Sequence, residues 1–531
     1  LRQICEIAIG RGDQTFIVYG DREISFHDFL ATSNSVSTGL RSFGLGHGDR
    51  VAVLSQNNPE WCETFWGTVN IGAILVGLNG WWTTDEIVYG LQDSGSKILV
   101  ADAKRFERIA GNLDECPDLE HVFLIDADPA DFDGSGDKRL HRFDELLAEP
   151  ADGAPDAPID EDDYAVIFYT SGTTGRPKGA ISTHRSMIAN LQNTIYGGVA
   201  GAMLGGGALP QSAGQTVALF TSPLFHVSGC HSTLVVGLLA GLKLVMVEGR
   251  FDPPGALELI QRHKVTLWAT VPTMVWRVCE YPDRHDYDTS SVVSVAFGGS
   301  PSAEELQRKV HETFPNVGTT TNAYGLTESS SVATAISGRD AVEKPTSVGQ
   351  PVPTLELKIR DAAGNEVPTG ATGEVTMYGP LIMAGYWNKP EATADTVRDG
   401  WLYTGDIGYV DDDGFLFITD RKKDMIIRGG ENIYCVEIEN RLVEHPAIAD
   451  AAVIGVPHPE LGEEVKAVVQ LEPGASLSEQ EIRSWVAEAL ANFKVPAYVE
   501  VREDKLPRNA SGKLLKNVLR GEGEVSFAET M

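Results

Sequence analysis

At positions 169–179 the chain reads Tyr169-Thr170-Ser171-Gly172-Thr173-Thr174-Gly175-Arg176-Pro177-Lys178-Gly179. This run follows four apolar residues, Ala165 to Phe168, which are typical of a buried strand. Glycines let a backbone wrap closely around phosphate oxygens, hydroxyls and amides donate hydrogen bonds to those oxygens, and Lys178 supplies a positive charge. The spacing differs from a Walker A loop, which is G-x-x-x-x-G-K followed by Ser or Thr. We therefore predict a strand followed by a phosphate-binding loop, in preference to a flexible surface turn.

The regions on either side of this loop predict an α/β fold. Strand-like runs at Arg50–Leu54 and Ser96–Val100 alternate with helical stretches, as in an open, largely parallel sheet. The segment 126–163 is rich in Asp, Pro, Ala and Gly, and we interpret it as a solvated connection to a second α/β unit that begins at Tyr164 and runs to about Ser337. Short strands with glycine punctuation follow in 347–420. The fold predicted is α/β, with a large N-terminal domain of two α/β subdomains plus a small β-rich unit, and a smaller α+β C-terminal domain.

Composition narrows the possible ligands and compartments. The chain has 531 residues and a formal net charge of −32, which argues against general nucleic-acid binding. The same charge repels anionic ligands, so any site for them must be built from local cations and backbone donors. No apolar run reaches the length of about 18 residues that a membrane span needs, the N-terminus shows no signal-peptide pattern, and the six cysteines are scattered. These features favour a cytoplasmic protein with no transmembrane segment.

Five further motifs occur in order along the chain. They are Gly298-Gly299-Ser300, Tyr324-Gly325-Leu326-Thr327-Glu328, Tyr403-Thr404-Gly405-Asp406, Asp420-Arg421-Lys422-Lys423-Asp424 and Leu506-Pro507-Arg508-Asn509-Ala510-Ser511-Gly512-Lys513. Together with the phosphate loop they resemble the adenylate-forming superfamily, which includes acyl-CoA synthetases, aryl-CoA ligases, firefly luciferase and peptide-synthetase adenylation domains. The resemblance extends from about residue 10 to residue 520 and is closest to fatty-acid or related acid–CoA ligases.

The resemblance implies an enzyme that joins a carboxylic acid to coenzyme A in two steps. The acid and ATP would give acyl-AMP and pyrophosphate, and acyl-AMP and coenzyme A would then give acyl-CoA and AMP, with Mg²⁺ as a cofactor. It also implies an N-terminal domain at 1–420 with the acyl and ATP sites, a hinge at 421–423, and a mobile C-terminal domain at 424–531. A homodimer is left open.

The motifs also specify a nucleotide site. Tyr324 offers an aromatic face to adenine, Thr327 can donate a hydrogen bond to a phosphate, and Glu328 is a hard carboxylate suited to Mg²⁺. By resemblance, Asp406 and Arg421 contact the ribose. The residues predicted to bind ATP or AMP are Thr170, Ser171, Gly172, Thr173, Thr174, Lys178, Gly299, Ser300, Asn322, Tyr324, Gly325, Asp406 and Arg421.

Lys513 is predicted to be catalytic, together with Glu328 and Thr327. In the family this lysine reaches the reacting carboxylate and α-phosphate, where it offsets negative charge. Lys423 occupies the hinge position. The residues predicted to approach coenzyme A are Arg428, Gly429, Gly430 and Lys494, and for Lys494 plain solvation is an equal alternative.

The acid itself is less defined. We predict an acyl pocket formed by His226, Val227, Gly229, Thr273 and Gly298. Adenylation domains for amino acids carry an Asp where His226 stands, which argues against an amino-acid substrate. The segment 186–220 is longer than usual in the family and can be packing filler or the wall of a tunnel. A medium- or long-chain fatty acid or a bulky apolar acid is the first hypothesis, and aryl or alicyclic acids, including steroid-derived ones, are the alternative. Transfer to a separate carrier protein, and an inactive acyl or nucleotide sensor, are further alternatives.

Overall fold

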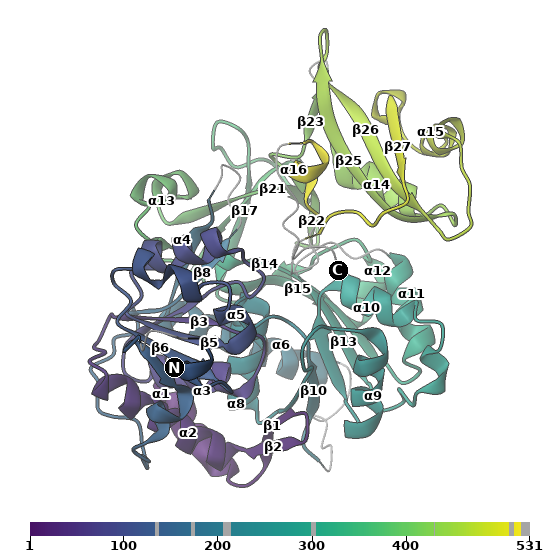
Figure 1. The fold of residues 1–531 in the computed structure, drawn as a ribbon. Coiled ribbons are helices and arrows are strands. Elements are labelled where there is room, and N and C mark those ends of the chain that lie inside the picture. Colours follow the sequence, from purple (N-terminus) through teal and green to yellow (C-terminus); the bar gives the residue numbers. More distant parts are fainter. Residues whose placement is uncertain are drawn as a thin grey trace.

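A computed structural model describes residues 1–132, 137–170, 176–204, 214–298, 304–428, 431–508 and 514–521. Figure 1 shows a large α/β body and, above it, a smaller domain formed by the last strands and helices. The α/β class and the division into a large N-terminal and a small C-terminal domain are confirmed.

The first sheet of the body contains eight described strands. Their order is β19 (Gly385–Tyr386), β9 (Lys178–Thr183), β8 (Tyr164–Thr170), β4 (Ile74–Gly77), β3 (Arg50–Leu54), β5 (Ile98–Asp102), β6 (His121–Ile125) and β7 (Leu140–Arg142). Strands β3 to β8 pair in parallel, whereas β9 and β19 are antiparallel to their neighbours.

The second sheet of the body contains nine described strands. Their order is β16 (Gln350–Pro351), β15 (Ser331–Ser337), β14 (Thr319–Leu326), β13 (Ser294–Gly298), β12 (Leu267–Thr270), β10 (Val217–Phe220), β11 (Lys243–Met246), β1 (Thr15–Tyr19) and β2 (Arg22–Ser25). The strands from β14 to β1 are parallel, and β2, β15 and β16 are antiparallel edges.

Parallel strands of this kind are apolar on both faces and must be covered by helices on both sides. Helix α3 (Pro59–Val69) is buried along its whole length and begins at a cap in which the Asn58 side chain accepts a hydrogen bond from Trp61 N at 2.8 Å. Phe168 of the first sheet and Phe16 of the second belong to one buried apolar cluster. The two sheets therefore share a core.

The predicted boundary between the two α/β subdomains is wrong. Strands β8 and β9, which begin at Tyr164, complete the first sheet and do not start the second, while β1 and β2 near the N-terminus belong to the second sheet. The segment 126–163 is also more than a connection, because its strand β7 pairs with β6. An apolar run marks a strand but does not reveal its partner, and this is why the sequence placed the boundary incorrectly.

The β-rich unit predicted at 347–420 is confirmed as a third sheet. It contains β17 (Glu356–Arg360), β18 (Gly373–Tyr378), β21 (Trp401–Val410), β20 (Val397–Arg398) and β22 (Leu416–Arg421). Strand β22 runs directly into the segment that leads to the C-terminal domain, so Arg421 is the last residue of the body's sheets.

The C-terminal domain has its own sheet and its own core. The strand order is β24 (Glu431–Ile433), β23 (Ile426–Arg428), β26 (Gly462–Leu471) and β25 (Ile448–His458), and β27 (Tyr498–Arg502) pairs with β26. Helices α14 (Cys435–Val443) and α15 (Glu479–Ala487) contribute Ile438, Leu442, Ile482 and Val486 to that core. Helix α16 (Lys516–Leu519) ends the described chain.

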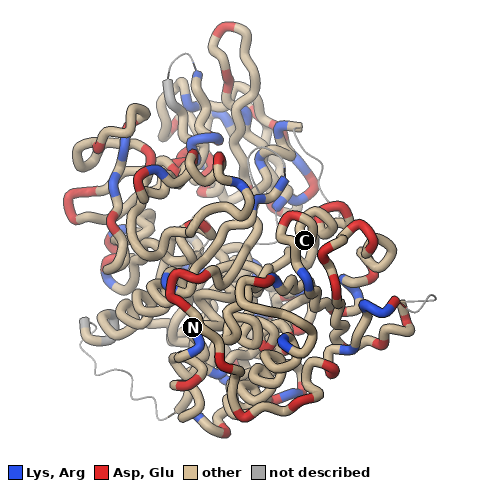
Figure 2. Tube along the Cα trace, turned by 90° about the vertical axis from the view of Figure 1, so that its left-hand side faces the viewer, with Lys and Arg blue, Asp and Glu red and all other residues tan. Residues whose placement is uncertain are grey.

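Two properties of the whole molecule bear on its ligands. In the part of the chain described above, no helix combines the length and apolarity needed to cross a bilayer. Figure 2 shows acidic positions over the visible side with Lys and Arg interspersed among them. An anionic ligand therefore has to be attracted by a local group of cations.

Candidate active site

Three side chains predicted to contact the nucleotide lie together on β14, β21 and β22. The Tyr324 hydroxyl donates to Asp406 Oδ2 at 2.5 Å, and Arg421 Nε lies 2.9 Å from Asp406 Oδ1. Asp406 is only 2% exposed. Burial, followed by the neighbouring Asp406 carboxylate, raises the pKa of Tyr324 well above its usual value, so this phenol remains a donor at neutral pH. The three residues form a fixed polar group beside an aromatic face.

A second group connects Lys178 with Glu328 through a residue that the sequence reasoning missed. The Tyr386 hydroxyl donates to Glu328 Oε1 at 2.8 Å, and Lys178 Nζ lies 5.1 Å from the centre of the Tyr386 ring. Lys178 begins β9, Glu328 lies in the short turn η7 (Thr327–Ser329), and Tyr386 is in β19. Burial, and then Glu328, raises the pKa of Tyr386. One phenol thus links the cation and the carboxylate expected at the phosphates.

The remaining described residues of the predicted nucleotide site lie next to these groups. Thr170 ends β8, and Thr327 begins the turn that carries Glu328. Gly325 packs so tightly that an added Cβ would lie 1.6 Å from Ser331 O, which explains the glycine. The side-chain amide of Asn322 donates to Ser347 O at 3.0 Å, so its NH₂ group has a partner within the protein.

Nine predicted residues lie outside the described residues. They are Ser171, Gly172, Thr173, Thr174, Gly299, Ser300, Gly429, Gly430 and Lys513. Their assigned roles stay predictions.

The predicted acyl pocket begins at His226, which precedes helix α7 (Val227–Gly229). The chain continues through a π-helical turn, η5 (Cys230–Val235). Such turns are rare in proteins overall, but those that occur are often found at functional sites. Burial lowers the pKa of His226 to about 4, so the imidazole is neutral at physiological pH. An added Cβ at Gly229 would lie 2.2 Å from Pro223 O, so a larger residue cannot be accommodated without backbone movement.

The other two residues assigned to this pocket come from neighbouring elements. Thr273 is in the first turn of α10 (Pro272–Cys279), and Gly298 ends β13. Because β12 leads into α10 and pairs with β13, the sheet brings these two residues to the same edge.

Serines that the sequence did not single out connect the acyl pocket to the Glu328 turn. Ser331 Oγ lies 2.6 Å from Ser232 Oγ, and His231 Nδ1 lies 3.3 Å from Ser330 O. Ser330 and Ser331 have φ values of 50° and 113°, conformations that cost L-residues energy and persist only where the surroundings impose them. Burial lowers the pKa of His231 to about 4. The π-helical turn therefore fixes the backbone that follows Glu328.

The two cations predicted to approach coenzyme A are paired with acids. Arg428 Nε lies 2.6 Å from Glu464 Oε1, and Lys494 Nζ lies 2.6 Å from Glu437 Oε2. Lys494 is therefore paired in this structure and not simply solvated, and its contact with a phosphate of coenzyme A stays a prediction. Lys423 is exposed in the turn between β22 and β23.

A buried ionic group lies directly at this turn. Asp420 accepts hydrogen bonds from Arg421 N at 2.7 Å and from Cys435 N. Lys516 Nζ lies 2.8 Å from Glu439 Oε1, and its charge acts on Asp420. Burial raises the pKa of Asp420 to about 6 although Lys516 opposes the shift. The helix that follows the Lys513 segment is thereby linked to the predicted hinge.

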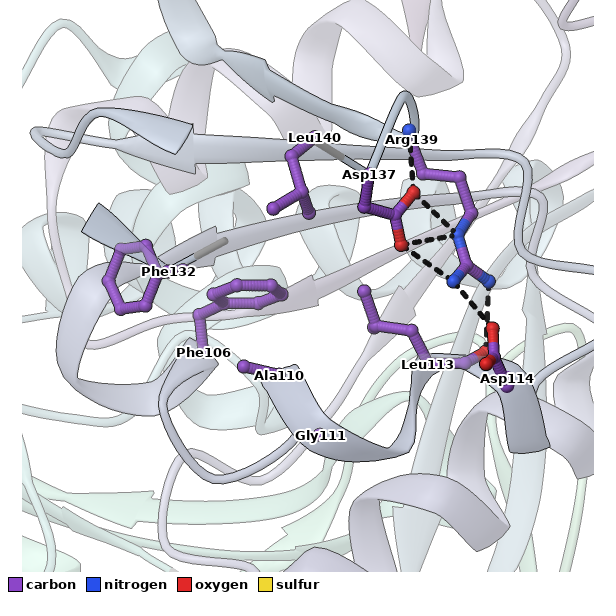
Figure 3. A pocket seen from close by; sticks show the side chains of 9 residues that line it. All are labelled: Phe106, Ala110, Gly111, Leu113, Asp114, Phe132, Asp137, Arg139 and Leu140. Atoms are coloured by element: carbon purple, nitrogen blue, oxygen red, sulfur yellow. Dashed lines mark hydrogen bonds and ion pairs between the residues drawn. The ribbon is translucent and has the colours of Figure 1, made fainter. Parts of the chain in front are cut away.

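A pocket that the sequence did not indicate lies at the other edge of the first sheet. Figure 3 shows apolar side chains such as Phe106 and Phe132 on one side and Arg139 on the other. Arg139 is held by Asp137 at 2.7 Å and by Asp114 at 2.8 Å, so its charge is already paired. This pocket shares no residue with the predicted site.

Local sequence patterns could not have identified Tyr386. It is one of 14 tyrosines and lies 58 positions from Glu328, and its role depends on the pairing of β19 with β9. Ser330 and Ser331 lie two and three positions after Glu328, and their spacing carries no signal for the left-handed backbone that the fold imposes.

The sequence was compared with models of protein families and with known proteins. The model of the AMP-binding enzyme family matches residues 6–387, and that of the AMP-binding enzyme C-terminal domain matches residues 437–513. The chain is 34% identical to a feruloyl-CoA synthase of Amycolatopsis sp, with 95% of each chain covered. It is also 34% identical to a long-chain-fatty-acid–CoA ligase of Bacillus subtilis strain 168, covering 96% of this chain and 92% of that protein.

A similar solved structure is that of o-succinylbenzoate CoA synthetase from Bacillus subtilis, in complex with the acyl-adenylate intermediate OSB-AMP. Its TM-score is 0.79, with 31% sequence identity and 98% of each chain covered.

Proposed function

Because the chain belongs to the AMP-binding enzyme family and is an AMP-forming acid–CoA ligase, we propose that its acid is a medium- or long-chain fatty acid or another bulky apolar acid. The single observation that carries this proposal is the His226 site. Its imidazole is held neutral by burial and is followed by small or apolar residues, with no carboxylate at that position to pair with an ammonium group.

The proposed nucleotide site combines the two polar groups. Adenine lies against Tyr324, the ribose hydroxyls bond to Asp406 and Arg421, and the phosphates face Lys178 and Thr327. This arrangement is supported by the spacing of the groups along β14, β21 and β9, which contribute a ring, a carboxylate and a cation from three separate elements. A fixed constellation of this kind lowers the barrier mainly by orientation and electrostatics.

The residues also fit a magnesium ion. Glu328 uses one oxygen, Oε1, to accept the Tyr386 hydrogen bond, and a single carboxylate with phosphates and water as the other ligands is what Mg²⁺ prefers. Bound there, the ion would neutralise phosphate charge. Tyr386 orients the carboxylate that would hold it.

The chemistry proceeds in two balanced steps. A carboxylate oxygen of the acid attacks the α-phosphorus of ATP, an acyl–phosphate bond forms, and pyrophosphate leaves. The sulfur of coenzyme A then attacks the acyl carbon, its proton passes to solvent, and AMP leaves. Lys513 serves the first step, and rotation of residues 424–531 about Lys423 serves the second. A phosphate of coenzyme A that bonds to Arg428 or Lys494 would share these cations with Glu464 or Glu437, or displace the carboxylates.

A ring-bearing acid is the second candidate. The edge of the Trp81 ring meets Phe225, the residue before His226, with ring centres 5.3 Å apart, so an aromatic wall adjoins the proposed pocket. The similarity to a feruloyl-CoA synthase is as high as that to the fatty-acid ligase, and sequence identity alone does not separate the two classes.

The test is a panel of fatty, aromatic, alicyclic and amino acids, assayed for release of AMP that depends on both ATP and coenzyme A. We expect one AMP and one pyrophosphate per thioester. Activity should rise with the length of the fatty acid until the pocket is full, because each buried methylene contributes about 0.8 kcal/mol of binding free energy. Stoichiometric ADP and phosphate, or a preference for amino acids, would overturn the proposal. If the thioester formed only on an added carrier protein, the acceptor would be that protein and not coenzyme A.

A further inference from the structure

Asp93 occupies a position where an acid is locally unfavourable. It lies in the last turn of α4 (Thr84–Ser94), where the helix end carries partial negative charge that repels a carboxylate. Its side chain is only 6% exposed, in a chain whose net charge is already −32. A buried residue that is unfavourable for its local structure, and whose charge water cannot screen, often has a role in a functional site.

The contacts of Asp93 offset this cost. Lys389 Nζ lies 2.6 Å from Oδ1, and the Tyr169 hydroxyl donates to Oδ2 at 2.9 Å. The backbone carbonyl of Asp93, which has no partner within the helix, accepts hydrogen bonds from Trp387 Nε1 at 3.0 Å and from Asn388 Nδ2 at 3.3 Å. One residue thus fastens the end of β8 and the segment after β19 to the end of α4.

Two of these partners, Tyr169 and Trp387, adjoin residues of the proposed ATP site. Tyr169 immediately precedes Thr170. Trp387 N donates to Gly179 O at 2.8 Å, directly after Lys178, and Trp387 follows Tyr386, the residue that joins Lys178 to Glu328.

A second tyrosine, on α4 itself, reaches the residue just before β9. Tyr89, one helical turn before Asp93, donates its hydroxyl to Pro177 O at 3.0 Å and lies 3.4 Å from Asp93 Oδ1. The cation of Arg176 lies 5.0 Å over the Tyr89 ring. The residues just before Lys178 are therefore held from the same helix end as the residues after it.

We infer that Asp93 is a positioning residue for the ATP site: through Lys389 and Tyr169 it fixes where Lys178 and Glu328 stand relative to each other. The inference rests on the proposed function of those two residues. Without the Asp93 carboxylate, the segment carrying Tyr386 loses its ion pair to α4, and Tyr169 at the end of β8 loses a charged hydrogen-bond acceptor. The acyl pocket and the C-terminal domain are not fastened through this residue.

The experiment compares Asp93→Asn with a matched control, Glu60→Gln. Both changes neutralise a buried acid paired with a cation, but Glu60 bonds to Arg22 on β2, the edge of the second sheet opposite to β14 and its Tyr324. The probe is α,β-methylene-ATP with magnesium, bound to the full chain and followed by calorimetry. Its binding does not depend on which acid is the substrate.

We expect Asp93→Asn to weaken binding of the analogue about tenfold or more, while Glu60→Gln leaves it unchanged. In turnover the KM for ATP should rise with little change in the KM for the acid. Conversion of prepared acyl-AMP and coenzyme A should stay near the wild-type rate. Lys389→Met should give a similar loss, and combining it with Asp93→Asn should add little, because both remove the same ion pair.

The inference would be overturned if Asp93→Asn bound the analogue as tightly as the wild type does. It would also be overturned if Asp93→Asn and Glu60→Gln lost affinity for every substrate to the same extent. Failure of the wild-type chain to bind the analogue would instead overturn the proposed ATP site, and this inference with it. The two failures are therefore distinguishable.

Discussion

The carboxyl group of Glu63 on helix α3 has an unusually high pKa. The residue is 4% exposed and lies beside Glu60. Burial, with the Glu60 charge adding to it, raises the pKa of Glu63 from 4.5 to about 8. Because the folded pKa is the higher one, the native state holds the proton more tightly than the unfolded chain. The contribution of this group to stability is largest below pH 4.5 and declines as the pH rises through 8.

Glu63→Gln should remove this decline, since glutamine keeps the shape and stays neutral. Urea unfolding of the wild-type chain should show a free energy that falls between about pH 5 and pH 9, and the variant should fall less, by an amount on the order of a few kcal/mol. The exposed Glu107→Gln serves as the control and should follow the wild type. Parallel curves for Glu63→Gln and wild type would refute the assignment of the buried proton.

Tyr386 supports Glu328 at the proposed ATP site through one hydroxyl. Tyr386→Phe removes that donor and leaves the ring beside Lys178 in place. A hydrogen bond to a charged group contributes about 1.5–3 kcal/mol, so kcat/KM for ATP should fall by a factor of about 10–100. Pyrophosphate exchange measures this step. Tyr378→Phe, a change at a phenol that is 45% exposed, should have no effect, and equal rates for the two variants would exclude the role given to Tyr386.

At the scale of elements, helix α16 depends on one buried cation. Lys516 pairs with Glu439 of α14 at 2.8 Å and faces Asp420 at the end of β22. Lys516→Met would leave both carboxylates buried without this cation, a change that typically costs about 3–5 kcal/mol. We expect α16 to detach from the C-terminal domain.

Limited proteolysis measures that detachment, and cleavage between residues 505 and 520 should accelerate in Lys516→Met. Lys516→Arg retains the charge and should be cut at close to the wild-type rate. If both variants resisted cleavage equally, the helix would be held by its apolar contacts with β25 and not by the ion pair.

The sequence predicted elements better than their partners. Apolar runs identified β3, β5 and β8 because a buried parallel strand requires apolar residues on both faces. The same runs could not reveal that β8 pairs with β4 or that β1 pairs with β11, since pairing is decided by contacts across long stretches of chain. Asp93 was overlooked for the same reason: its ion pair with Lys389 spans 296 positions.

The family resemblance of the motifs, in contrast, identified polar residues that the fold brings together. Tyr324, Asp406 and Arg421 were predicted as one site from separate motifs, and the structure joins them by direct contacts. Arg428 and Lys494 were selected as isolated cations, and local sequence could not show their pairing with Glu464 and Glu437.

At the scale of the whole molecule, the two domains are joined by the turn that contains Lys423. If the C-terminal domain rotates there between the two half-reactions, Lys423→Pro should spare adenylation and abolish thioester formation, because proline fixes φ at the residue that must turn. Pyrophosphate exchange and conversion of prepared acyl-AMP measure the two steps separately.

Lys513→Ala should show the opposite behaviour. Loss of one well-placed electrostatic contact commonly costs about 3–4 kcal/mol, so adenylation should fall by a factor of several hundred or more. Thioester formation from prepared acyl-AMP should continue at a rate near that of the wild type. If both variants lost both steps equally, rotation about Lys423 would have to be abandoned.

The pairing of β1 with β11 also determines when the N-terminus can fold during synthesis on a ribosome. Ile17 pairs with Leu244, so the β1–β2 hairpin has no parallel partner until translation has passed that point. At about 5–20 residues per second, this leaves a delay of roughly ten to fifty seconds. During the delay, the edge of β1 that will pair with β11 has no partner, and Ile17 and Val18, which end at 0–2% exposure, lack this neighbour. The nascent chain therefore carries an unpaired strand edge, a feature that favours aggregation, before all strands of the nucleotide site have been synthesised.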